Sequence, residues 1–190
     1  MRLLKKQFKV FSLLFNLLII FTISACSSPD IKNYNNTKPD FNVLHFFNGE
    51  LEAKGVVMDR KGLVTRRFSV IMLGNISKSN ALDKEQLTLE EWFTFDDGEQ
   101  SKRTWIITKN DDGTYQGRAN DIIDVASGES LGMALHWDYE MDLTVEGTTY
   151  RVVFDDWLYR IDDHNVINRS YIKKWGFKVG EVILSIRKIK

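Results

Sequence analysis

The densest group of residues able to do chemistry lies near the C-terminal end of the 190-residue sequence. Asp155 and Asp156 are followed by Asp162, Asp163 and His164, and carboxylates with an imidazole are common metal ligands. The cluster lacks both a defined ligand spacing and a Gly-bearing loop. Asp155 and Asp156 would also point to opposite faces of a strand. We therefore predict no metal site, and interpret Asp162-Asp163 as a turn whose side chains bond nearby backbone N–H groups.

The sequence carries no recognisable nucleophile arrangement, and no Gly-x-Ser-x-Gly motif. Its three histidines are His45, His136 and His164. We expect His136 to lie on the solvated face of a strand and His45 to be a structural residue in an apolar cluster. We predict no catalytic residue and no cofactor. Because triads assemble from distant residues, a lipid-acting enzyme stays a hypothesis, which requires His45 or His164 beside an acidic or hydroxyl partner in a pocket.

Arginines recur inside the expected strands, for example Arg66, Arg118 and Arg151. An arginine that points into a protein interior must be paired or must meet an anionic ligand, such as a fatty carboxylate or a phosphate. A structural Arg–Asp pair is the favoured outcome, with an Asp of the 154–156 segment as its partner. The candidate ligand-contacting residues are Arg67, Arg103, Trp105, Asp155, Trp157 and Arg169.

Cys26 is the only cysteine and ends the run Ile23-Ser24-Ala25-Cys26. A basic start and an apolar stretch over 10–23 precede it, which is the arrangement of a signal peptide. This resembles a bacterial lipoprotein signal that is cleaved before Cys26, whose lipidation would anchor the chain to a membrane. An ordinary secretory signal and an uncleaved anchor helix are the alternatives. By resemblance, Ser27 and Ser28 favour the outer membrane, at its periplasmic face, over the inner membrane.

The charge balance argues against nucleic acid as a partner. The chain has 26 basic and 26 acidic residues, and four of the basic ones precede Cys26, so the mature chain is mildly acidic. With Cys26 acylated, no thiol remains for a disulfide or a thiolate metal site. Stability must therefore come from an apolar core, which a single domain of this length can provide.

The elements that would position these residues are almost all β-strands. We expect a signal peptide over 1–25, a lipidated cysteine with a polar tether over 26–42, and a β-barrel domain over 43–190. Asp-Gly turns indicate hairpins over 55–74 and 88–108, and a further strand is expected over 115–123. Apolar and polar residues alternate over 133–143, as in a strand with one buried face. A short helical turn is expected only over 79–86.

About nine strands in series predict an all-β fold, a single antiparallel lipocalin-like barrel of the calycin type. Several stretches resemble an uncharacterised family of Gram-negative lipoproteins, domain of unknown function 3833. They include Phe47-Asn48-Gly49, Arg103-Thr104-Trp105, Phe154-Asp155-Asp156-Trp157 and Ile167-Asn168-Arg169. The resemblance implies a periplasm-facing lipoprotein with a lipocalin-like barrel, and implies no established activity. The first strand lacks the Gly-x-Trp of true lipocalins, so the likeness concerns architecture only.

Three hypotheses for function follow. The leading one is that the anchored barrel binds or chaperones a lipid or another apolar ligand near the membrane, since an interior of this class can be filled or can hold one small ligand. The second is a non-catalytic structural or interaction module of the cell envelope, which requires a filled interior and an exposed apolar patch. The third is an enzyme that acts on lipids.

Overall fold

The computed structural model describes residues 29–79, 84–145 and 147–189. The expected signal peptide and the lipidation site Cys26 lie outside these residues, and both stay predictions. Residues Ile31–Lys190 form one compact unit. None of the helices in the described ranges has the length and hydropathy needed to cross a membrane.

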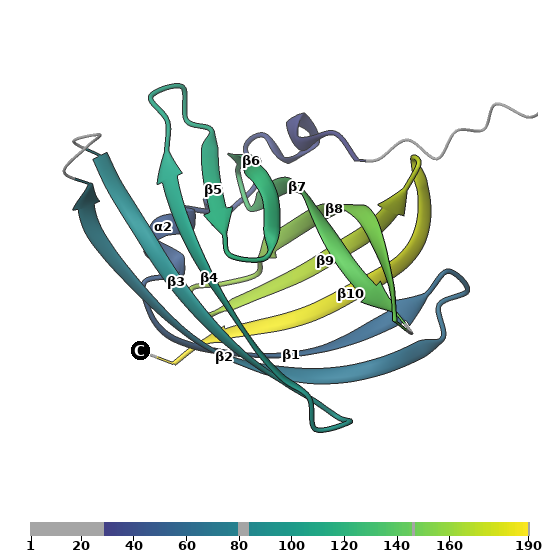
Figure 1. The fold of residues 1–190 in the computed structure, drawn as a ribbon. Helices are drawn as coiled ribbons and strands as arrows, with labels where there is room; N and C mark the ends of the chain where they lie inside the picture. Colours follow the sequence, from purple (N-terminus) through teal and green to yellow (C-terminus); the bar gives the residue numbers. More distant parts are fainter. Residues whose placement is uncertain (1–28, 80–83, 146, 190) are drawn as a thin grey trace, which may run out of the picture. The chain divides into compact units, whose positions relative to one another are not determined.

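Within the described residues, ten antiparallel strands close into a barrel (Figure 1). They are β1 (Gly49–Asp59), β2 (Val64–Ser79), β3 (Lys84–Phe95), β4 (Gln100–Lys109), β5 (Tyr115–Ala119), β6 (Ile122–Leu131), β7 (Ala134–Val145), β8 (Thr148–Arg160), β9 (Asn165–Lys174) and β10 (Phe177–Lys188). Each strand pairs with its neighbours in sequence, and β1 pairs with β10 to close the sheet. Closure therefore leaves no open sheet edge among these ten strands. The predicted single antiparallel all-β barrel is confirmed.

Tight turns join the strands where the sequence places Asp and Gly. In the β1–β2 turn, Asp59 Oδ1 accepts hydrogen bonds from the backbone N–H groups of Lys61 and Leu63, at 2.8 and 3.0 Å. Gly62 follows with a φ of 86°, a value that glycine adopts without steric cost. The β1–β2 and β3–β4 hairpins therefore form where they were predicted.

One predicted strand is broken in two, which gives one strand more than the nine expected. Asn120 and Asp121 make the turn between β5 and β6 instead of continuing the strand. The side-chain oxygen of Asn120 accepts the backbone N–H of Thr104 at 2.8 Å, and Asp121 binds Arg103. These two polar side chains end the β5 pairing with β4. The helical turn expected over 79–86 is also wrong in part, because Lys84 to Gln86 belong to β3, while residues 80–83 lie outside the described ranges.

The alternation predicted over 133–143 is confirmed in β7. Leu135, Trp137, Tyr139 and Met141 are buried on the inner face, while the residues between them are more exposed. Two glycines, Gly117 and Gly128, make room for the Trp137 ring, the largest of these side chains. A Cβ atom at Gly117 would lie 2.6 Å from the Trp137 ring, closer than atoms can pack.

The segment before β1 differs from the prediction of a polar tether over 26–42. Residues Ile31–Tyr34 form a 3-10 helix, η1, and Val43–Phe46 form the short helix α2. Ile31 packs with Ala134 and Trp157 on the outer wall of the barrel. Phe41 is buried among core residues, and its backbone N–H donates to the carbonyl of Gly132 at 2.7 Å. The tether prediction is therefore wrong from Ile31 onward, because a few well-placed apolar residues bind this segment to the barrel.

Candidate functional site

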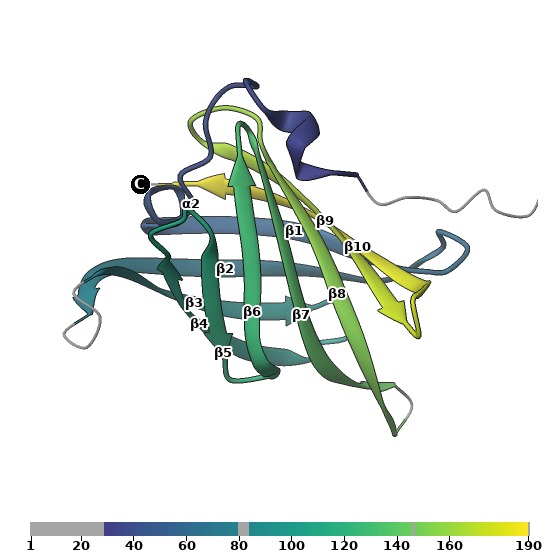
Figure 2. The same ribbon diagram turned by 90° about the horizontal axis from the view of Figure 1, so that it is seen from above.

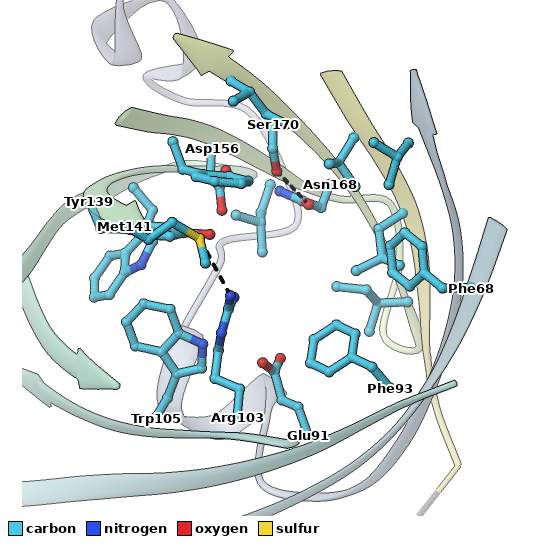
Figure 3. Close-up of a pocket in the computed structure, with 18 of the residues that line it drawn as sticks. Phe68, Glu91, Phe93, Arg103, Trp105, Tyr139, Met141, Asp156, Asn168 and Ser170 are labelled. Carbon is cyan, nitrogen blue, oxygen red and sulfur yellow. Dashed lines mark hydrogen bonds between the residues drawn. The ribbon is translucent and has the colours of Figure 1, made fainter. Parts of the chain in front are cut away.

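The inward-facing side chains of the barrel leave a cavity of about 740 Å³. Its wall is mainly aromatic and aliphatic, with contributions from every strand of the barrel except β5 and β6 (Figure 3). Trp105 meets Trp137 and Tyr139 edge to face, at centroid distances of 5.8 and 5.3 Å. On another part of the wall, the ring centroids of Phe68 and Phe93 lie 6.1 Å apart. These packed rings fix the shape of an apolar chamber.

One end of the cavity is closed by the segment that precedes β1. Val43 and Phe47 line the cavity there, and Phe41 packs behind them. The side chain of Asn42 caps α2 by accepting the backbone N–H of His45 at 3.3 Å. Lys188 Nζ, from the end of β10, donates to backbone carbonyls of this segment, including that of Phe46 at 2.9 Å. The segment 41–47, which we call the plug, is thus tied to the last strand of the barrel.

The opposite end of the cavity opens between hairpin turns. Thr65 and Val145 line it and are both exposed, Val145 with 54% of its surface accessible. Arg66 also lines this end, where it forms ion pairs with Asp97 at 2.8 Å and Glu99 at 2.9 Å. A solute that enters the cavity here passes Thr65, Val145 and the ion pairs of Arg66.

Arg103, from β4, is the cation of the cavity interior (Figure 3). Its Nε atom donates to both carboxylate oxygens of Asp121, at 2.9 and 2.8 Å. Its guanidinium carbon lies 5.7 Å from the ring centre of Trp105 and 5.9 Å from that of Tyr139. Burial alone would lower the pKa of Arg103, but the surrounding anionic groups outweigh burial and raise the pKa above its usual value. The guanidinium is therefore permanently charged.

Two carboxyl groups, Glu91 of β3 and Asp156 of β8, share this cavity with Arg103 (Figure 3). Burial raises the pKa of each to about 7, although the positive charge of Arg103 opposes both shifts. Near neutral pH each group is therefore divided between its charged and its protonated form. Among the described residues, Asp156 Oδ1 is buried without a hydrogen-bond partner. Asp156 thus brings an unused hydrogen-bond acceptor to the cavity wall.

Two of the six predicted ligand-contacting residues, Arg103 and Trp105, line the cavity. The inward partner of Arg103 is an aspartate, as expected for a structural pair, but it is Asp121 from the β5–β6 turn instead of an Asp of the 154–156 segment. Asp156 of that segment does face the cavity, on the wall of β8.

The other four, Arg67, Asp155, Trp157 and Arg169, lie on the outer face of the barrel, so their prediction as contacts of an interior ligand is wrong. Arg67 Nε donates to Asp96 at 2.9 Å. Arg169 Nε donates to Glu181 at 2.5 Å. Both arginines belong to structural ion pairs. They point away from the cavity because successive side chains of a strand alternate between its two faces.

Asp155 and Trp157 belong to a separate polar cluster on the outer wall, beneath η1. Asp155 Oδ1 lies 2.8 Å from His136 Nε2 and accepts the indole N–H of Trp157 at 2.9 Å. Lys173 also donates to Asp155. His136 lies on the outer face, as expected, but its ring stacks on that of Trp157 at a centroid distance of 4.4 Å and its side chain is only 29% exposed, so the expectation that it is solvated holds only in part. Burial would raise the pKa of Asp155, but His136 and Lys173 lower it to about 2.

The remaining sequence candidates lie away from the cavity. Asp162 accepts the backbone N–H groups of His164 and Asn165, at 2.7 and 2.8 Å, which confirms the turn interpretation. His45 is exposed and lies 3.9 Å from Glu85, so the prediction of a structural histidine within an apolar cluster is wrong. His136, Asp138 and Asp155 have the spacing of a metal site, but the ammonium group of Lys173 already pairs with Asp155.

Sequence reasoning did not select Glu91, Arg66 or Tyr139 as site residues. A signal for Glu91 was present, because it interrupts an alternating apolar series on β3, between Leu89 and Phe93. A charged residue on the buried face of a strand is rare unless it has a partner or a function. Arg66 is the β2 arginine that lines the cavity, since it shares the inner face with Phe68.

Comparison with solved structures supports a lipocalin-like barrel. The structure of the S-type phycobiliprotein lyase CPES from Guillardia theta is similar, with a TM-score of 0.54 over 77% of this chain and 90% of that chain, at 10% identity. This likeness concerns the fold alone. No curated protein matches the sequence. The model of one protein family, described as "Protein of unknown function (DUF3833)", matches residues 20–188. The chain therefore belongs to the DUF3833 family.

Proposed function

We propose that the barrel binds one lipid-sized, mainly apolar molecule in its interior. The observation that carries this proposal is the cavity of about 740 Å³ behind an apolar wall. Ligand sites of proteins commonly measure about 300–1,000 Å³ and combine apolar walls with a few polar groups. Water alone would fill this space poorly, because an apolar wall offers it few hydrogen-bond partners.

The polar groups indicate how such a ligand would be oriented. Its apolar part would lie against the rings of Phe68, Phe93 and Trp105. Its polar group would lie near Arg103, which donates hydrogen bonds, and Asp156 Oδ1, which has no partner among the described residues. A headgroup that both accepts and donates hydrogen bonds satisfies this pair, because a buried polar atom without a partner costs about 1–3 kcal/mol.

Uptake of a fluorescent fatty-acid probe by a protein of residues 27–190 tests this proposal. Val182 lines the cavity, whereas its neighbour Ile183 is exposed on the outer face of β10. We expect Val182→Trp to weaken probe binding by at least about tenfold, because the indole occupies the ligand space. Ile183→Trp, the matched control, should leave binding unchanged. Absence of uptake for every lipid class tried, or equal effects of both variants, would argue against the proposal.

We further propose that the chain is a lipoprotein of the outer membrane, held at its periplasmic face by acyl chains on Cys26. The run Ile23-Ser24-Ala25-Cys26 after a basic and apolar leader supports this. The mass of the mature N-terminus should show cleavage before Cys26 and two or three acyl groups. Cys26→Ser should leave the protein out of the membrane fraction, and its persistence there would contradict the anchor.

A further inference from the structure

Three hairpin turns at the open end of the barrel carry large exposed apolar side chains. In the β9–β10 turn, Trp175 is 86% exposed and Phe177 is 75% exposed. Leu63 in the β1–β2 turn is 67% exposed, and Val145 at the end of β7 is 54% exposed. Both ribbon views place these three turns at the same end of the barrel (Figures 1 and 2). Large apolar side chains gathered at one end of a protein mark an interaction surface.

The backbone at Trp175 shows that this residue does not serve the fold. Trp175 and Gly176 are the two central residues of a tight turn, with φ values of 51° and 81°. Such turns favour Asn-Gly or Asp-Gly, because a bulky side chain is strained at positive φ. Trp175 accepts this strain and buries almost none of its surface. Its side chain therefore adds little to the stability of the folded chain and is exposed to contact another surface.

Basic residues flank the exposed apolar ones. Arg60 and Lys61 precede Leu63, and Lys174 precedes Trp175. The ammonium group of Lys174 lies 4.6 Å from the Trp175 ring centre. Tryptophan and lysine at loop tips suit the boundary between hydrocarbon and headgroups, where the ring is buried and the ammonium meets anionic groups. Each basic side chain near an anionic bilayer strengthens binding severalfold.

We propose that this rim docks on the surface of an anionic lipid bilayer. The rim consists of Leu63, Trp175 and Phe177 with Arg60, Lys61 and Lys174. The same end of the barrel holds the cavity mouth at Thr65 and Val145, so docking places the cavity opening against lipid. If the cavity binds a lipid, as proposed above, the ligand moves between bilayer and barrel without crossing water. Docking itself does not depend on that ligand.

The environment of a fluorophore attached to the full chain tests the proposal. Cys26→Ser removes the only native thiol, and an environment-sensitive fluorophore is then attached through Phe177→Cys or, as control, through Ile71→Cys. Ile71 is 59% exposed on the outer wall of β2. With phosphatidylcholine vesicles that contain phosphatidylglycerol, we expect a blue-shifted emission, quenched by brominated lipid, only from the label at 177. An unshifted label at 177, or equal shifts at both positions, would overturn the proposal. So would a shift at 177 that grows with protein concentration without vesicles, which would indicate contact between two chains.

Two further variants separate docking from folding. Trp175→Asn introduces the preferred Asn-Gly turn, so we expect unchanged or higher thermal stability. The fluorescence response of the label at 177 to vesicles should become severalfold weaker. Arg60→Glu with Lys61→Glu should raise the lipid concentration for half-maximal response by about tenfold or more. A response that neither variant changes would contradict the assigned surface. Probe uptake in solution by the same variants should stay normal, so that failure of docking is distinguishable from failure of ligand binding.

Discussion

Arg103 and Asp121 join the wall of the cavity to the β5–β6 turn, with Nε 2.9 and 2.8 Å from the two carboxylate oxygens. The same guanidinium donates through Nη2 to Met141 Sδ at 3.7 Å, and Arg103 lines the chamber that Glu91 and Asp156 also line. One ion pair thus fixes a cation in an apolar interior and ends a strand at the same time.

Arg103→Met should destabilise the protein by about 3–5 kcal/mol, because it leaves carboxyl groups in the interior without their cation. Urea unfolding at pH 7 measures this change. Arg67→Met is the matched control. Arg67 pairs with Asp96 on the outer face, and such exposed pairs contribute less than about 1 kcal/mol. Equal losses for the two variants would contradict the interior role of Arg103.

The free energy of unfolding should fall as the pH rises from about 4 to 7. Burial raises the pKa of Glu91 from 4.5, and that of Asp156 from 3.8, to about 7. In this window the folded protein retains protons that the unfolded chain has released, so a rising pH favours unfolding until both groups are ionised. We expect a loss on the order of a few kcal/mol, measured by urea unfolding across the range.

Glu91→Gln with Asp156→Asn should remove most of this slope, because the amides do not titrate. Asp155 provides a contrast of opposite sign. Its pKa is lowered to about 2, so its stabilising contribution is present above pH 4 and is lost as the pH falls toward 2. A slope between pH 4 and 7 that the double variant retains would show that other groups cause it.

Binding of an anionic fatty-acid probe should weaken as the pH rises from 6 to 8. Glu91 and Asp156 become negatively charged in the same cavity over this range, and like charges repel at short range in a poorly solvated site. A neutral probe of the same chain length should bind with little pH dependence. Fluorescence titrations of the two probes check this, and parallel behaviour would place the carboxyl groups outside the binding site.

Gly117→Ala should destabilise the barrel by about 1–3 kcal/mol. The added Cβ would lie 2.6 and 2.8 Å from two atoms of the Trp137 ring. Trp137→Phe removes the outer part of that ring, so the double variant should lose less stability than the sum of the single variants. Thermal unfolding of the three variants forms the cycle, and strict additivity would contradict the contact.

Phe41→Ala should destabilise the protein by about 3–5 kcal/mol, because it empties the plug at the closed end. Phe41 is 3% exposed, and its ring lies 5.6 Å from that of Phe46. Lys38→Ala, which removes an exposed ion pair with Asp40, is a control from the same segment and should change little. Urea unfolding compares them. A small loss for Phe41→Ala would indicate that this segment is a tether after all.

The fold class follows from the sequence because its signals are local. Asp-Gly turns and the alternation around Trp137 each specify a strand or a turn within a few residues. The plug at Phe41 and the strand break at Asn120 were not predictable in this way. Both depend on partners far along the chain, Gly132 in one case and Thr104 in the other.

The site shows the same division. Alternation alone required that Asp155 and Asp156 face opposite ways, and that Arg103 share a face with Trp105. Which face is the interior was not determined locally, because β2 carries apolar residues on both sides, with Met72 buried and Ile71 exposed. Closure of the sheet and its register decided that Arg66, Glu91 and Asp156 line the cavity while Arg67 and Asp155 lie outside. A strand's own sequence sets its two faces, but only its neighbours in the barrel decide which of them encloses the ligand space.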